Sequence, residues 1–408
     1  MPTENFSLLD GFLVLIAVTA AVIMLRPAIR DAEYWRATVT PLASIIGSGF
    51  LVVAPLLASI VGAWSVLCII LIVLLSIWIG SALRFNILHD SGPAPGGKLE
   101  QAIETFSDLA LALAYVISVT FYVRLMSGFI LDGVDAYTGF NADILASLVL
   151  VLIGVYGWRR GLFGLERLEE FSVTIKLAVI VSLLLGLIFY DVNHGYPLAE
   201  FSSPETGVWE GARKLAGLLL IVQGFETSKY LASAYGRKLR AQSMKLAQVL
   251  AGIIYIAFVA LALPLMGSFT QLAPTETAII GVSANITLIL PLMLILAATM
   301  SQFSAAIADI IGAGGVVEDV GRNRVRAQLC YPVIALLAIA LMWSSHIFEI
   351  VTFASRAFAF YYFLQTLQAV LLACKVEAGK PRWLLVGSYS ALSVLLLWVV
   401  IFAVPVEG

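Results

Sequence analysis

The sequence has few charged residues, and this shortage excludes a soluble protein. Only 12% of the 408 residues are Asp, Glu, Lys or Arg, while 61% are hydrophobic. Soluble globular proteins carry about 25% charged residues. The mean hydropathy of +0.99 instead predicts an all-α integral membrane protein that crosses the bilayer several times.

Cysteine and histidine are also scarce, which argues against metal, disulfide or acid–base chemistry. The three cysteines lie in or at the end of apolar runs without CxxC or CxxH spacing, so they are interpreted as packing residues: Cys68, Cys330 and Cys374. The three histidines fall at loop or interface positions, where a proton relay is not expected: His89, His194 and His346. No catalytic cluster is visible, so we expect no enzyme, no cofactor and no metal site. Nothing in the composition suggests a nucleic-acid partner.

Apolar runs of about twenty residues, the length that crosses a hydrocarbon core, recur along the chain. The first, 8–25, has no positive charge before it, so we expect an uncleaved extra helix and not a signal peptide. Eleven more spans bring the prediction to twelve transmembrane helices: 37–60, 62–84, 102–132, 142–158, 168–190, 212–235, 246–267, 284–314, 327–345, 347–374 and 383–404. The expected organisation is an N-terminal helix with a cytoplasmic link (1–35), a core (36–374) and a C-terminal helix (375–408).

The Lys and Arg residues alternate between the two sides of these spans. Eighteen of the 24 fall in loops on one side, and only Arg213 and Lys214 fall on the other. Cytoplasmic loops are the ones enriched in Lys and Arg. The pattern therefore predicts a multi-pass protein of the cell membrane, embedded in a lipid bilayer, with both termini outside.

Two apolar segments are interrupted by small or polar residues. Gly47, Ser48 and Gly49 break the run between Thr40 and Pro55, and the sequence QGFE at 223–226 breaks the run 215–230. A helix that breaks inside a bilayer leaves N–H and C=O groups that only protein or water can satisfy. Two such breaks at corresponding places in two halves are typical of secondary transporters and indicate the substrate site.

Five segments in order resemble the amino acid-polyamine-organocation (APC) transporter superfamily. They read IGSGFLVVAP, GAWSVLCIILIVLLSIWIGSALRFNI, GWRRGLFGLERLEEFSVTIKLAVI, LAGLLLIVQGFETSKYLASAYGRKLR and SAAIADIIGAGGVVEDVGR, and the similarity covers roughly residues 37–374. Phe50 stands where the family has isoleucine in its GxGIF pattern. Other departures are the extra N-terminal helix, a single helix after the core, and Gln223, where the family favours small or aromatic residues.

This resemblance implies a LeuT-type fold and a transport function. The fold would be a five-plus-five inverted repeat, with repeats 37–191 and 211–374 and broken first and sixth core helices. The first break would offer N–H groups and a positive helix dipole to a carboxylate, and the second would offer carbonyls to an ammonium. Close packing of small residues is the alternative interpretation of the glycines. The expected substrate-binding residues are Ile46, Gly47, Ser48, Gly49, Val222, Gln223, Gly224 and Phe225.

Lys176 aligns with a lysine that fills the sodium site in sodium-independent members of the superfamily. Its expected partners are carbonyls near Ala43 and Ile46 and the hydroxyls of Ser301 or Ser304. An ammonium at this point mimics a bound cation and can exchange a proton. An ion pair with Asp309 is an equally open alternative.

Other charged residues inside the spans are expected to pair, because an unpaired charge in a bilayer is costly. Glu226 and Lys229, three residues apart, are expected to form an ion pair on one helix face. Arg124 and Arg356, with Glu349 two turns from Arg356, are expected to form a gate or to attract an anionic substrate.

The sequence therefore predicts a secondary active transporter of amino acids or related amines that works by alternating access. The Lys176 alignment favours sodium-independent transport, coupled to protons or running as an exchanger. The alternative is a transporter-like sensor or regulatory subunit that binds a small molecule without concentrative flux.

Overall fold

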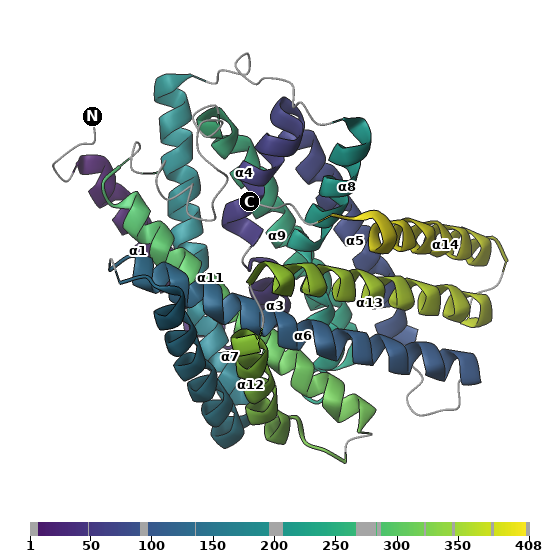
Figure 1. The fold of residues 1–408 in the computed structure, drawn as a ribbon. Coiled ribbons are helices and arrows are strands. Elements are labelled where there is room, and N and C mark those ends of the chain that lie inside the picture. The colour runs from purple at the N-terminus through teal and green to yellow at the C-terminus, as the bar shows by residue number, and fades with distance from the viewer. Residues whose placement is uncertain are drawn as a thin grey trace.

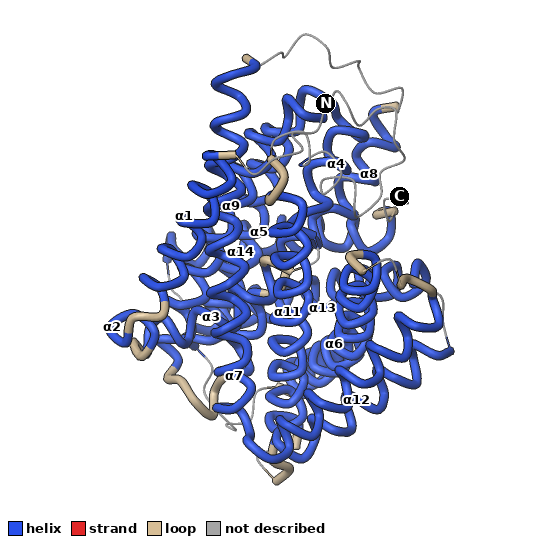
Figure 2. The backbone as a smooth tube through the Cα atoms, turned by 90° about the vertical axis from the view of Figure 1, so that its left-hand side faces the viewer, coloured by secondary structure: helices blue, strands red, loops and turns tan. Residues whose placement is uncertain are grey.

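The computed structural model describes residues 7–47, 49–89, 97–134, 136–195, 207–266, 283, 287–321, 324–344, 347–376 and 379–404. Within these ranges every regular element is a helix (Figures 1 and 2). Eight helices among the described residues are long and apolar enough to cross a membrane. Helices are expected here because a bilayer offers backbone groups no water, and a helix pairs them within its own segment.

The helices follow the predicted apolar runs, but α9 begins nine residues before its predicted span and α11 ends six residues after its own. In chain order they are α1 (Leu8–Met24), α2 (Pro27–Arg30), α3 (Glu33–Ile45), α4 (Gly49–Val61), η1 (Gly62–Trp64), α5 (Ser65–His89), α6 (Lys98–Asp132), α7 (Gly139–His194), α8 (Val208–Leu218), η2 (Leu219–Val222), η3 (Phe225–Tyr230), α9 (Arg237–Met266), α11 (Leu290–Val320), α12 (Ala327–Ser344), α13 (Ile347–Val376) and α14 (Gly379–Phe402). The η elements are 3-10 helices. Local capping helps to fix the start of α1, where the Ser7 and Asp10 side chains satisfy each other's backbone N–H groups.

Helix α7 contains two predicted spans joined without a loop. It has 56 residues, which corresponds to about 84 Å of straight helix and exceeds a hydrocarbon core of about 30 Å. The axis changes direction at Gly161, whose φ of 64° lies in the left-handed region. Glycine permits this conformation because it has no Cβ.

Both predicted interruptions are present. Helix α3 ends at Ile45 and α4 begins at Gly49. The second interruption separates η2 from η3, and Gly224 between them has a φ of 111°.

Helix α11 runs through the middle of the bundle (Figure 2), and almost all of its second half is buried. It packs against α6, α7 and the first broken segment, α3. Helix α1 packs against α7, and α14 lies beside α13 (Figure 1). The interrupted segments pack against α5, α7, α9 and α11, so their free backbone groups face protein.

Candidate functional site

The Lys176 side chain fills the gap at the end of α3. Its Nζ donates hydrogen bonds to the carbonyls of Ala43 at 2.9 Å and Ile46 at 2.7 Å, and to the hydroxyl of Ser304 at 2.8 Å. The last carbonyls of a helix have no partner within the helix. A lysine from α7 thus replaces the missing amide donors of the next turn.

The number of acceptors indicates the charge state of Lys176. A protonated amine has three N–H donors, and three acceptors surround this one. Ser304 Oγ is free to accept because it donates its own hydrogen to the carbonyl of Ser301 at 3.0 Å. Lys176 is fully buried, and a buried charge is tolerated only when hydrogen bonds satisfy it. The three acceptors therefore match the three N–H donors of an ammonium.

Two further side chains donate hydrogen bonds to backbone carbonyls at the first break. Ser301 Oγ lies 2.6 Å from the Ile46 carbonyl and 3.1 Å from the Gly47 carbonyl. Tyr255 on α9 places its hydroxyl 2.9 Å from the carbonyl of Ile45. The structure thus brings Ala43, Lys176, Ser301 and Ser304 together around one set of exposed carbonyls.

The Asp309 carboxylate on α11 accepts hydrogen bonds from two hydroxyl groups. Ser44 donates to one carboxylate oxygen at 2.8 Å, and Ser118 on α6 donates to the other. Asp309 is buried, and Lys176 donates its three hydrogens elsewhere. The alternative ion pair between Lys176 and Asp309 is therefore not formed, because each group already has other partners.

At the second break a carboxylate accepts a hydrogen bond from a free backbone N–H group. The Gly224 N–H donates to Glu226 Oε2 at 3.0 Å, and the Tyr362 hydroxyl on α13 donates to the same oxygen. Tyr115 on α6 donates to Oε1 at 3.4 Å. Glu226 is fully buried and receives only donors, which suits an ionised carboxylate.

The expected ion pair between Glu226 and Lys229 is wrong. The Glu226 carboxylate turns back to the Gly224 N–H and to Tyr362, which leaves Lys229 without a carboxylate partner on its own segment. Lys229 Nζ instead lies 5.3 Å from the centroid of the Tyr230 ring, a cation–π arrangement.

The two breaks touch each other. A Cβ built on Gly224 would lie 2.4 Å from Ser44 Oγ and 2.7 Å from the backbone nitrogen of Ile45. A Cβ on Gly49 would lie 2.3 Å from Ile221 Cγ2. The Tyr255 hydroxyl is within hydrogen-bond distance of Ile45 and, at 3.2 Å, of the Ile221 carbonyl, so it bridges both segments.

The residues predicted to bind substrate surround this contact. Val222 and Phe225 are buried, and Phe225 stacks on Tyr362 with ring centroids 5.2 Å apart. The Oε1 atom of Gln223 is buried without a hydrogen-bond partner. Tyr122 on α6 packs against Gly47. Ser48 lies outside the described residues.

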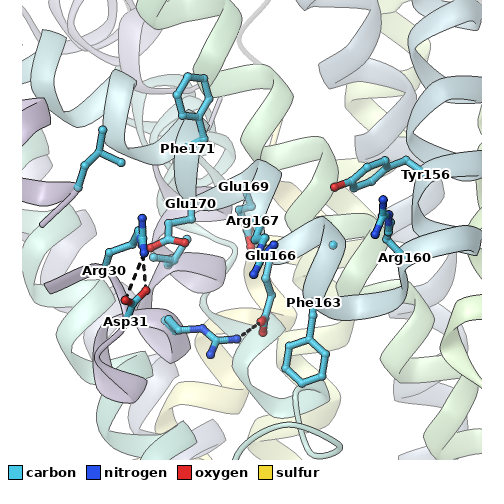
Figure 3. Close-up of a pocket in the computed structure, with 14 residues that line it drawn as sticks. Arg30, Asp31, Tyr156, Arg160, Phe163, Glu166, Arg167, Glu169, Glu170 and Phe171 are labelled. Atoms are coloured by element: carbon cyan, nitrogen blue, oxygen red, sulfur yellow. Dashed lines mark hydrogen bonds and ion pairs between the residues drawn. The ribbon is translucent and has the colours of Figure 1, made fainter. Parts of the chain in front are cut away.

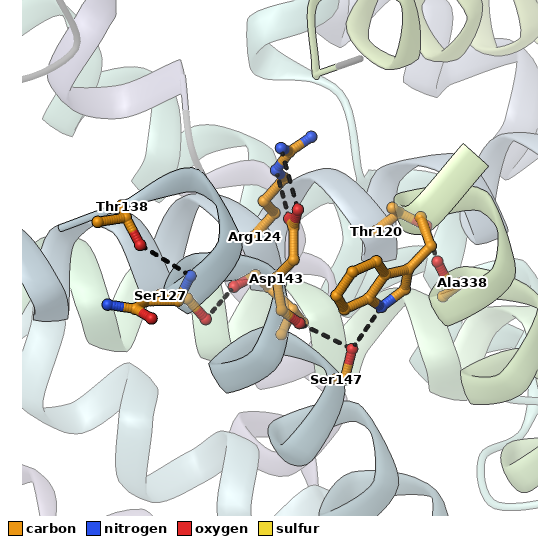
Figure 4. Close-up of polar contacts among 10 residues, drawn as sticks. Thr120, Arg124, Ser127, Thr138, Asp143, Ser147 and Ala338 are labelled. Atoms are coloured by element: carbon orange, nitrogen blue, oxygen red, sulfur yellow. Dashed lines mark hydrogen bonds and ion pairs between the residues drawn. The ribbon is translucent and has the colours of Figure 1, made fainter. Parts of the chain in front are cut away.

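Of the predicted gate residues, Arg124 has a partner that the sequence did not indicate. Arg124 pairs with Asp143 on α7, with Nε and Oδ1 2.9 Å apart (Figure 4). Asp143 was not identified from the sequence, because the pairing depends on how α6 packs against α7. Arg356 on α13 is exposed, and the side chain of Glu349 lies outside what the structure describes.

A cavity of about 940 Å³ has four arginines in its lining: Arg30, Arg36, Arg160 and Arg167 (Figure 3). It is lined by residues of α2, α3 and the bend of α7. At its rim Arg30 donates hydrogen bonds to both carboxylate oxygens of Asp31 and holds the pKa of that carboxylate below its ordinary value. Deeper in, Arg36 pairs with Glu166 at 2.9 Å.

No metal centre is found in the described ranges, where no three His, Cys, Asp or Glu side chains gather closely enough to hold an ion.

Several site residues escape prediction from the sequence. Tyr255, Tyr362 and Ser44 contact the breaks directly, and each is one of several polar residues on its helix. Their polarity is a weak signal, because such residues also occur on faces that turn to other helices or to lipid. Only the packing of α9, α13 and α3 shows that these three face the breaks.

The chain is similar in sequence to a known family of membrane transporters. The family described as "APC superfamily transporter" matches residues 27–403. An uncharacterised protein of Aquifex aeolicus is 39% identical over 389 residues, which is 94% of each chain.

Solved structures with a similar fold are transporters. A manganese transporter of Eremococcus coleocola, in complex with an aromatic bis-isothiourea substituted compound, has a TM-score of 0.58 at 14% identity over 90% of this chain and 86% of its own. MhsT in complex with L-phenylalanine has a TM-score of 0.58 at 16% identity over 90% and 98% of the two chains. At these identities the likeness concerns the fold alone. Because the family match spans most of the sequence, the chain belongs to the APC superfamily of membrane transporters, which are not enzymes.

Proposed function

We propose that this transporter moves amino acids or related amines by alternating access, without sodium, coupled to protons or by exchange. The observation that carries the proposal is the Lys176 ammonium, held by Ala43, Ile46 and Ser304 at the end of α3. Carbonyl and hydroxyl oxygens are the ligands of alkali-metal ions at broken helices. Here the Lys176 side chain lies among such oxygens, so the protein itself supplies the positive charge that a bound ion would bring.

The contact between the two breaks supports a substrate site there. The N-terminal end of α4 carries a positive dipole that suits a carboxylate. The unpaired Gln223 oxygen is an acceptor that suits an ammonium, since a buried polar atom without a partner is unfavourable. Both features together suit an amino acid. MhsT, one of the structural neighbours, was solved with L-phenylalanine.

The proposed membrane arrangement has twelve spans in two inverted repeats. The eight long apolar helices become twelve if the bent α7 crosses twice and if α1, α3 with α4, and α8 with η3 each cross once. The arginine-rich loops then lie in the cytoplasm and both termini outside.

A binding screen followed by transport measurements tests the proposal. Amino acids, amines and organic acids are added to the purified protein, and a ligand of the folded state raises its unfolding temperature. Each hit is then offered, radiolabelled, to proteoliposomes in sodium or choline buffer. We expect concentrative uptake or exchange at equal rates in both buffers. Binding without any flux would indicate a sensor, and uptake only in sodium would refute the proposed coupling.

A further inference from the structure

Glu169 is a second buried ionisable group on α7, and it lies between the cavity and Lys176. Its side chain is fully buried, yet it belongs to the cavity lining (Figure 3). The Thr40 hydroxyl donates to Oε2 at 2.7 Å. The other carboxylate oxygen, Oε1, is buried without any hydrogen-bond partner. A carboxylate left half-satisfied in the interior is unfavourable, so its presence calls for a role.

One face of α3 contacts three ionisable residues of α7: Glu166, Glu169 and Lys176. Arg36 pairs with Glu166, Thr40 donates to Glu169, and the Ala43 and Ile46 carbonyls accept from Lys176. These α3 residues follow one another at helical spacing, so they form a single stripe. Movement of α3 away from α7 would therefore release Glu169 and Lys176 at the same time.

Glu169 and Lys176 also face the same helix, α3. They are seven residues apart on α7, which puts them on one face and about 10.5 Å apart along the axis. Every Cα–Cβ bond of a helix tilts toward the helix N-terminus, which at Lys176 is the side of Glu169.

We propose that Glu169 carries the coupling proton between Lys176 and the cytoplasmic cavity. This inference rests on the proposed function, in which Lys176 occupies the cation position. When α3 moves, the ammonium loses the Ala43 and Ile46 carbonyls and gives its proton, through water that enters from the cavity, to the Glu169 carboxylate. The products are a neutral amine and a neutral carboxylic acid, so no charge is created in the interior. The acid then releases the proton to water in the cavity.

The neutral amine also explains why proton loss favours opening. It has two N–H donors where the ammonium has three, so one acceptor at the end of α3 is left unpaired. Reprotonation through Glu169 restores the third hydrogen bond and closes α3 against α7.

Other ionisable groups surround Glu169, and the test must separate it from them. From its own helix come Glu166 and Lys176, from α11 Asp309, and from the segment before α9 Tyr235. The cavity adds charged residues from α2, α3 and the bend of α7: Arg30, Asp31, Arg36, Arg160, Arg167 and Glu170.

The experiment compares two modes of transport in proteoliposomes of the full-length protein. The probe is an equimolar mixture of radiolabelled amino acids. The first mode is uptake driven by a proton gradient, and the second is counterflow exchange at equal pH on both sides. Glu169→Gln keeps the shape and the Thr40 contact but cannot release a proton. We expect it to lower gradient-driven uptake about 100-fold, the size of a proton-transfer contribution, and to leave counterflow within about twofold.

Two further variants keep the result decisive. Glu170→Gln makes the same change at the next residue, which lines the same cavity, and should match the wild type in both modes. Glu169→Asp keeps a carboxylate and should restore part of the gradient-driven uptake.

Each remaining outcome overturns the inference in a recognisable way. Full gradient-driven uptake by Glu169→Gln would exclude the proton-carrying role, and equal loss of both modes would assign Glu169 a structural one. If the wild type shows counterflow but no response to the proton gradient, transport stands and the relay is wrong. If the wild type shows neither mode, the proposed function itself fails.

Discussion

The first break is satisfied by a cation from another helix, and the second by an anion from its own segment. Lys176 reaches the end of α3 from α7, 130 residues away from Ile46 in the sequence. Glu226 reaches the N–H of Gly224 from two residues further along the chain. Both solve the problem of free backbone groups in the interior.

The difference in origin has a mechanical consequence. If α3 moves relative to α7, the first break loses its counter-charge. The second break carries its counter-charge with it, whichever helices move. The first break is therefore suited to coupling ion binding to movement, and the second to keeping its shape. Our predictions test this division, from the largest expected effect to the smallest.

Substitution of Gly224 should be the most damaging change. Gly224→Ala places a Cβ 2.4 Å from Ser44 Oγ and forces an L-residue to a φ of 111°. Strain and overpacking together should cost about 3 kcal/mol or more of stability. The control is Gly236→Ala, where a Cβ meets nothing within 4 Å. Thermal unfolding of both purified variants checks the prediction, and equal unfolding temperatures would contradict it.

Removal of the Glu226 charge should have the next largest effect. Both carboxylate oxygens of Glu226 accept hydrogen bonds. In Glu226→Gln one of these oxygens becomes an NH₂ group, which cannot accept a hydrogen bond and would face a donor in either orientation of the amide. The loss should be about 2 kcal/mol, the range for hydrogen bonds to a charged group. Glu210→Gln, an exposed site on α8, should unfold like the wild type. Equal stability of the Glu226 and Glu210 variants would show that the second break does not depend on its anion.

The smallest effect is expected from the hydroxyls around Lys176. Ser304→Ala removes one of the three acceptors of the ammonium and should cost about 1.5 kcal/mol. It should also change the pH dependence of transport, because it disfavours the protonated amine. Ser301→Ala removes a donor to the Ile46 and Gly47 carbonyls but leaves the three lysine bonds intact. Its pH profile of uptake should follow the wild type, and identical pH profiles for both serine variants would contradict the assignment.

The fold could be predicted from the sequence because bilayer length and apolar runs constrain it strongly. Helix ends agree with the predicted spans within a few residues at α6, α12 and α13. The interruptions at Gly47–Gly49 and at Gly224 are also visible in the sequence, since small residues stand out in long apolar runs.

The site could be predicted only for residues that the family resemblance aligns with a position of known function in the family. Lys176 and its partners were found in this way. Tyr255 and Glu169 were not, because their roles depend on which face of α9 or α7 turns inward, and a membrane helix that is apolar toward both lipid and protein shows no such face in its sequence. The Glu226–Lys229 pair failed because spacing alone ignores the competing Gly224 N–H.

The most direct test of the central claim is sodium dependence in the wild type and in Lys176→Ala. Uptake into proteoliposomes is measured with sodium and proton gradients imposed independently, and substrate binding is measured in parallel. If the Lys176 ammonium occupies the cation position, wild-type uptake should be the same in sodium and choline. Lys176→Ala should then lose concentrative uptake while keeping some binding, and Lys176→Arg should not restore uptake, because a guanidinium does not release its proton in this range. Sodium-dependent uptake by the wild type, or full uptake by Lys176→Ala, would contradict the claim.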